Sequence, residues 1–127
     1  MSLVLADTSV WVAHFRSAIP ALRSLVESDQ VLCHPLVVLE IACGTPPSPR
    51  ERTLADLKIL RHAVVASTDE TLALIEREQL HGSGCGAVDM MLLASVLLTP
   101  GALLWTLDQS LDSLAARSGV AFSAVAR

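Results

Sequence analysis

The stretch Leu3-Val4-Leu5-Ala6-Asp7-Thr8-Ser9-Val10-Trp11 decides the fold of this chain. Its first four residues form an apolar run long enough for one buried strand, and two small hydroxyl residues after Asp7 open a helix. Asp7 therefore stands at the carboxyl end of a strand, and in an open parallel sheet this edge is where ligands bind. Taken alone, Asp7 is explained by helix capping, because an Asp side chain satisfies the free amides of a first turn.

The composition bounds the size of the protein and the classes of partner. The chain has 127 residues, 52% of them hydrophobic, so we expect a single domain over residues 1–127 with a substantial core. With two Trp, two Phe and no Tyr, a wide platform for stacking bases is not expected. A net charge of -4 argues against a broad basic surface for nucleic acid, although a local cluster of carboxylates stays possible.

Cysteines, histidines and hydropathy place the chain among soluble proteins. Three cysteines without C-x-x-C spacing predict buried, reduced thiols of a cytoplasmic protein, not a disulfide framework or a zinc site. The four histidines are scattered, so we expect each in a loop or at the surface. No targeting segment is evident, and the longest uncharged apolar stretch, Met90 to Leu98, is shorter than the ~18 residues that cross a bilayer.

Strands and helices are expected to alternate along the whole chain. We predict strands at 3–6, 31–33, 64–66 and 102–106, an edge strand at 120–122, and helices at 10–16, 20–27, 35–43, 50–61, 68–80, 87–98 and 109–117. The apolar helices 35–43 and 87–98 are expected to be buried. This alternation predicts an α/β fold whose central, mainly parallel sheet has four or five strands and is flanked by helices.

Four acids occupy comparable positions in this scheme. Asp7 and Asp108 follow strands, while Glu40 and Asp89 lie in the two apolar helices. Each has a structural explanation: Asp108 as a helix cap, Asp89 as a partner of a helix dipole, Glu40 paired with an arginine or reaching solvent. Asp112, one turn after Asp108, is interpreted as a surface residue.

Read together, the four acids favour a shared divalent cation. Burying an unpaired carboxylate costs several kcal/mol, and no basic residue lies within the two apolar helices. Carboxylate oxygens without paired His or Cys suit Mg²⁺ or Mn²⁺. Such a site suits phosphodiester hydrolysis, since the metal lowers the pKa of a bound water and stabilises charge on the phosphate. A metal that neutralises the phosphate also makes the negative net charge compatible with a nuclease.

The chain resembles a known family, the PIN-domain ribonucleases, and in particular the VapC-type toxins of bacterial toxin–antitoxin pairs. The resemblance spans nearly the whole chain, and the order and spacing of its pieces match the family. The pieces are Asp7-Thr8-Ser9-Val10-Trp11, Leu39-Glu40-Ile41-Ala42, Asp89-Met90-Met91-Leu92-Leu93-Ala94 and Thr106-Leu107-Asp108.

This resemblance implies a PIN-like three-layer fold and an endoribonuclease that acts on RNA. It implies that the four acids line a catalytic Mg²⁺ or Mn²⁺ site, namely Asp7, Glu40, Asp89 and Asp108, with Thr8, Ser9 and Thr106 as polar neighbours. It also implies a homodimer and a VapB-like antitoxin that inserts a C-terminal segment, often an arginine, into the acidic pocket. Many members carry another acid where this chain has Ala13-His14, so the number of metals stays open.

Two other functions compete with the nuclease. A catalytically inactive interaction module on the same fold would bind a protein partner without cleaving RNA. A phospho-acceptor domain would also use an acid at a strand end, but it needs a lysine near that edge, and Lys58 falls in the amphipathic helix 50–61.

Overall fold

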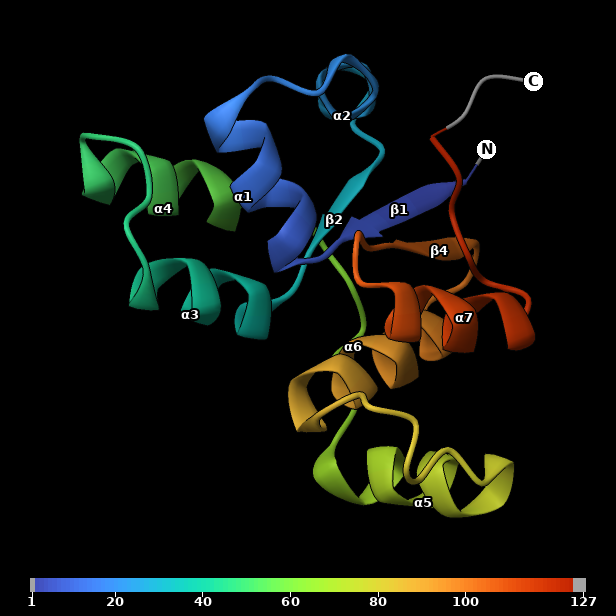
Figure 1. Ribbon diagram of the computed structural model, residues 1–127. Helices are drawn as coiled ribbons and strands as arrows, with labels where there is room; N and C mark the ends of the chain where they lie inside the picture. Colours follow the sequence, from blue (N-terminus) through green and yellow to red (C-terminus); the bar gives the residue numbers. More distant parts are fainter. Residues whose placement is uncertain (1, 125–127) are drawn as a thin grey trace.

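A four-stranded parallel sheet forms the centre of the protein (Figure 1), whose structure is a computed structural model that describes residues 2–124. Its strands lie in the order β3-β2-β1-β4, and every neighbouring pair is parallel. The strands are β1 (Leu3–Ala6), β2 (Val31–Cys33), β3 (Arg61–His62) and β4 (Ala102–Trp105). The predicted α/β fold with a parallel sheet is confirmed.

Helices cover the sheet on both sides. Figure 1 shows α1 to α4 gathered on one side and α5 to α7 on the other. The helices are α1 (Thr8–Arg16), α2 (Pro20–Glu27), α3 (Pro35–Cys43), α4 (Arg50–Lys58), α5 (Thr68–Glu78), α6 (Ala87–Leu98) and α7 (Gln109–Arg117). Asp7 caps α1 and Asp108 caps α7, each accepting a hydrogen bond from a first-turn backbone amide, as predicted. None of the helices in residues 2–124 is both long enough and apolar enough to span a membrane.

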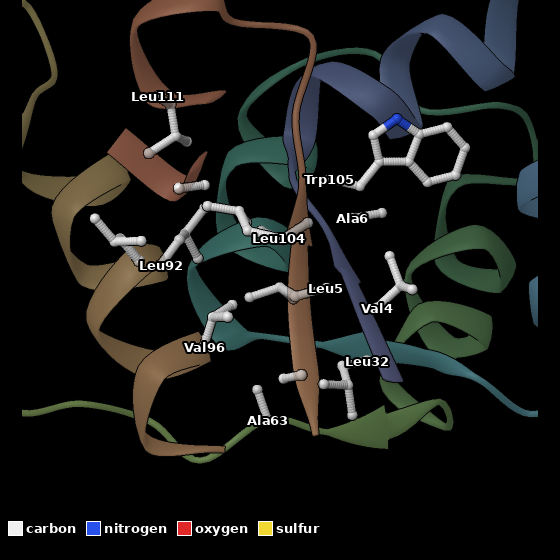
Figure 2. Close-up of a cluster of buried hydrophobic side chains, with 14 of the residues drawn as sticks. Val4, Leu5, Ala6, Leu32, Ala63, Leu92, Val96, Leu104, Trp105 and Leu111 are labelled. Carbon is white, nitrogen blue, oxygen red and sulfur yellow. The ribbon is translucent and has the colours of Figure 1, made fainter. Parts of the chain in front are cut away.

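The core follows the two-residue period of the central strands. Leu5 and Leu104 point toward α6, where Leu92 and Val96 meet them (Figure 2), and all four side chains are at most 1% exposed. Their neighbours along the strands face the opposite layer of helices. Because Ala6 pairs with Trp105, the residues that follow the two strands, Asp7 and Thr106, emerge side by side at the carboxyl edge of the sheet.

The third strand is not where the sequence predicts it. The prediction of a strand at 64–66 is wrong: the sheet uses Arg61–His62, and the chain then leaves it. The amides of Val64 and Ala66 donate to Oγ1 of Thr99 and Oγ of Ser95, at 2.9 and 3.0 Å. Ser95 lies in α6 and Thr99 caps its C-terminal end one turn later, so their side chains satisfy the amides that a neighbouring strand would otherwise pair with.

The predicted edge strand at 120–122 is present only as one isolated parallel bridge between Ala121 and Leu104. Its backbone still bonds to β4, since the amide of Leu104 donates to the carbonyl of Val120 and the amide of Phe122 donates to the carbonyl of Leu104. The remaining short stretch is too brief to extend the sheet by a named strand.

The burial predictions for the helix 35–43, for Cys43 and for His34 also fail. Glu40 and Cys43 of α3 are exposed and Leu39 is 59% exposed, because α3 packs against α1 and α4 with one face and leaves the other open. An apolar sequence all round a helix therefore did not mean burial here. His34 departs in the other direction, since it is fully buried at the end of β2.

Candidate active site

Asp7 is the centre of a hydrogen-bonded cluster at the carboxyl edge of the sheet. Its side chain is 5% exposed, and Oδ1 accepts from Oγ of Ser9 at 2.5 Å and from the amide of Val10 at 3.2 Å. Oδ2 accepts from Oγ1 of Thr106 at 2.5 Å. A carboxylate offers about four acceptor positions, so these three donors hold the group rigidly and leave roughly one position open.

The same two hydroxyls hold the loop that follows β4. Oγ of Ser9 accepts from the amide of Leu107, and Oγ1 of Thr106 accepts from the amide of Asp108, both at 3.0 Å. Asp108 is exposed and uses Oδ1 to cap α7 through the amide of Leu111, and Oδ2 accepts from no donor in the described part of the chain. Two strand ends that are far apart in sequence are thus tied together.

Glu40 is connected to this cluster through the residue after Asp7. Oγ1 of Thr8 donates to Oε1 of Glu40 at 2.6 Å, across a separation of 32 residues. The contact joins the first turn of α1 to the middle of α3, which pack against each other. Glu40 therefore faces the carboxyl edge of the sheet from solvent, and its second oxygen has no donor among residues 2–124.

Asp89 is coupled to the cluster electrostatically. Burial raises the pKa of its carboxyl above the ordinary value, and the negative charges of Asp108, Asp7 and Glu40 raise it further, against a hydrogen bond from the amide of Gly86 that lowers it. A carboxylate whose pKa is raised by three other acids lies within their common field. The structure thus brings all four predicted acids to one region, Asp7 and Asp108 by hydrogen bonds through Thr106, Glu40 through Thr8, and Asp89 by electrostatic coupling.

The donor set fits a hard divalent cation in kind. Each acid keeps acceptor capacity that the described residues do not use, and carboxylate oxygens are ligands of Mg²⁺ and Mn²⁺. Within residues 2–124, however, no three His, Cys, Asp or Glu side chains are grouped so that they could hold a metal ion as they stand.

Two neighbours of the acids escaped the sequence analysis. The pKa of the Cys85 thiol is raised by burial and by the charges of Asp89 and Asp108, although a hydrogen bond with Ser83 opposes this. A cavity of about 430 Å³ adjoins Glu40 and has Arg16 and Phe15 on its wall. A free-standing thiol and an arginine at the end of a helix carry no sequence signal that links them to distant acids.

The hydroxyl of Thr106 is expected to stabilise the fold through Asp7. Thr106→Val keeps the shape of the side chain but leaves Oδ2 of a buried carboxylate without a donor, which costs about 1–3 kcal/mol. Urea unfolding at neutral pH measures this loss. Thr53→Val is the matched control, since its hydroxyl donates to the carbonyl of Pro47 in an exposed loop and its loss should cost little. Equal losses in the two variants would contradict a special demand of Asp7.

Comparisons with known proteins identify the family and two similar proteins. A family model described as the PIN domain matches residues 4–117, which is most of the chain. "Ribonuclease VapC32" of Mycobacterium tuberculosis, in the strains CDC 1551 / Oshkosh and ATCC 25618 / H37Rv, is 45% identical to this chain over 121 residues. That alignment covers 95% of this chain and 97% of the relative.

Proposed function

Because this chain belongs to the PIN domain family, we propose that it is a Mg²⁺- or Mn²⁺-dependent endoribonuclease that hydrolyses RNA phosphodiester bonds at the four-acid site. The observation that carries the proposal is the shared field of Asp7, Glu40, Asp89 and Asp108. A stable fold avoids such repulsion unless a function requires it, and perturbed carboxyl groups gather at functional sites. The names of the VapC32 ribonucleases support RNA as the substrate.

In this proposal Asp7, Asp89 and Asp108 hold the metal, and Glu40 ligates it or accepts a proton from the attacking water. When bound, the metal supplies a water of lowered pKa and stabilises charge on the phosphate. Ser9 and Thr106 fix both oxygens of Asp7, so this ligand is oriented before the metal arrives. Thr8 holds one oxygen of Glu40, and the other would ligate the metal or take up the proton.

The cavity beside Glu40 supports a phosphate substrate. Arg16 lies on its wall, and its side chain makes no hydrogen bond or ion pair with any residue in the described part of the chain, so its guanidinium is available to a phosphate. The positive charge of Arg16 offsets part of the negative charge of the chain near the site. We propose that the RNA strand passes from the acids toward Arg16.

We further propose that the protein is the toxin of a toxin–antitoxin pair. Its partner would be a VapB-like antitoxin that places a basic side chain among the acids, where the unbalanced negative charge favours a cation. The proposal includes a homodimer, as the resemblance to VapC-type toxins implies, and a cytoplasmic location, as the cysteine pattern indicates. Co-expression of the neighbouring short reading frame, followed by purification of the complex, tests the partner.

Metal removal is expected to abolish RNA cleavage. Purified protein treated with EDTA should leave a structured RNA intact, and added Mg²⁺ or Mn²⁺ should restore cleavage, because the carboxylates alone supply no activated water. Gel electrophoresis of labelled RNA measures both steps. Ca²⁺ is the comparison metal, because it also binds oxygen ligands but with a different geometry. Cleavage that persists in EDTA would overturn the metal-dependent mechanism. A protein that binds its partner normally but cleaves no RNA with either metal would be the inactive interaction module.

A further inference from the structure

Asp89 differs from Asp7 and Glu40 in how its carboxylate is held. The carboxylates of Asp7 and Glu40 accept hydrogen bonds from hydroxyls of other elements, Thr106 after β4 and Thr8 of α1, whereas the carboxylate of Asp108 caps its own helix and its backbone amide donates to Thr106. The hydrogen bond of Asp89 stays within its own helix, from the amide of Gly86 at the N-terminus of α6. The distance from Asp89 to the other acids therefore depends on where α6 lies as a whole.

Apolar packing holds most of α6, but it does not determine the position of the helix along its axis. The face toward the sheet is aliphatic and includes Leu92 and Val96 (Figure 2). Burial of aliphatic area is non-directional, so a small slide or rotation of the helix changes it little. Directional hydrogen bonds from α6 to other elements are the contacts that can fix the helix position.

Ser95 supplies such bonds from the centre of α6. Its hydroxyl donates to the carbonyl of Met91 within the helix at 2.7 Å and accepts from the amide of Ala66 at 3.0 Å. The third partner is Nε2 of His34, 2.9 Å away at the end of β2. Ser95 and His34 are both 0% exposed.

The hydrogen-bond pattern fixes the protonation of His34. The single proton of the Ser95 hydroxyl is used on Met91, so Nε2 of His34 must carry the proton and donate it to Ser95. Nδ1 of His34 accepts from the amide of Leu36 at 3.1 Å and caps α3. The imidazole is therefore neutral, and its two nitrogens connect the start of α3, which carries Glu40, to the middle of α6, which carries Asp89.

We propose that His34 and Ser95 are positioning residues whose buried hydrogen bond fixes α6 and thereby sets Asp89 at the right distance from the other acids. The proposal rests on the proposed function, because it assigns these two residues a role in the metal site. Each atom of the pair is satisfied, so the pair forms one directional contact inside an otherwise aliphatic layer. Neither residue touches metal or substrate.

Two substitutions of His34 separate its two bonds. His34→Asn places an amide oxygen near the position of Nδ1, so it keeps the cap on α3 and loses the contact with Ser95. His34→Gln places an amide near the position of Nε2, so it keeps a donor for Ser95 and loses the cap. Ser95→Ala removes the contact from the other side. Thr71→Val is the matched control, since it removes a buried hydroxyl that donates to the carbonyl of Ser67 in the first turn of α5.

Mn²⁺ affinity is the readout that separates positioning from stability. Titration calorimetry should show an affinity about tenfold weaker in Ser95→Ala and in His34→Asn, as for other residues that support metal ligands. His34→Gln and Thr71→Val should bind Mn²⁺ like the wild type, even where their Tm falls. The double variant His34→Asn with Ser95→Ala should bind no more weakly than Ser95→Ala alone, because both lose the same contact.

Backbone NMR of the metal-free protein gives a second readout. The amide resonances of Gly86 and Asp89 should shift in Ser95→Ala and His34→Asn and stay unchanged in Thr71→Val. Wild-type Mn²⁺ affinity and unshifted resonances in both variants would overturn the positioning role while leaving the nuclease intact. A wild-type protein that binds no Mn²⁺ would overturn the proposed function, and the NMR comparison would still decide whether the pair positions Asp89.

Discussion

RNA cleavage is expected to fall by roughly a thousandfold or more when Asp7 is replaced with asparagine, because the metal's contribution of several kcal/mol to the barrier is lost. Asparagine is as good a helix cap as aspartate, and its amide oxygen can still accept from the amide of Val10. The variant should therefore fold. Steady-state cleavage of labelled RNA with Mg²⁺ or Mn²⁺ measures the loss, and circular dichroism checks the fold.

Asp112→Asn is the matched control for Asp7→Asn. Asp112 also lies near Asp108, one turn along α7, but it is exposed, and the hydrogen bond between them joins its backbone amide to the carbonyl of Asp108 and does not involve its carboxylate. Its loss should leave cleavage unchanged. Induced expression adds a cellular test, since the wild type and Asp112→Asn should arrest growth and Asp7→Asn should not. Equal cleavage by Asp7→Asn and the wild type would remove the catalytic role of the carboxylate.

The elements that carry the acids could be predicted from local sequence signals. The bounds of α3, α6 and α7 match the prediction, because Pro35 starts one helix and an apolar run between Gly86 and Pro100 defines another. The caps by Asp7 and Asp108 were predicted for the same reason. Local chemistry was sufficient where one residue and its chain neighbours determined the conformation.

What the sequence could not predict depends on contacts between distant residues. The stretch 64–66 is rich in valine and alanine, yet its amides bond to hydroxyls on α6, a choice that is invisible in a propensity. Glu40 is exposed although the hydroxyl of Thr8, 32 residues away, bonds to it. His34 is buried because its Nε2 donates a hydrogen bond to the hydroxyl of Ser95, 61 positions away. The convergence of the acids was inferred from the resemblance and from the parallel sheet, and the assignment of catalytic residues stays a prediction.

Replacing Asp89 with asparagine is expected to stabilise the metal-free protein while removing metal binding. Burial and three neighbouring charges raise the pKa of Asp89 in the folded state, so ionising this carboxyl costs stability. The cost is absent in acid, begins as the pH rises through the unfolded value near 3.8, and is complete above the folded value. In EDTA at pH 7 the variant should therefore have a higher Tm than the wild type, and the difference should vanish below about pH 4.

Added Mn²⁺ should reverse this order, since a ligand at a hundred times its Kd stabilises the protein that binds it by about 2.7 kcal/mol. Thermal scans with EDTA and with Mn²⁺ measure both states. Asp69→Asn, in the first turn of α5, is the control for an acid that only complements a helix dipole. If Asp89 only complemented the dipole of α6, its loss would lower stability by about 0.3–1 kcal/mol, as expected for Asp69. A stability gain for Asp89→Asn beside a loss for Asp69→Asn would instead mean that the fold tolerates repulsion at α6 for the sake of a cation.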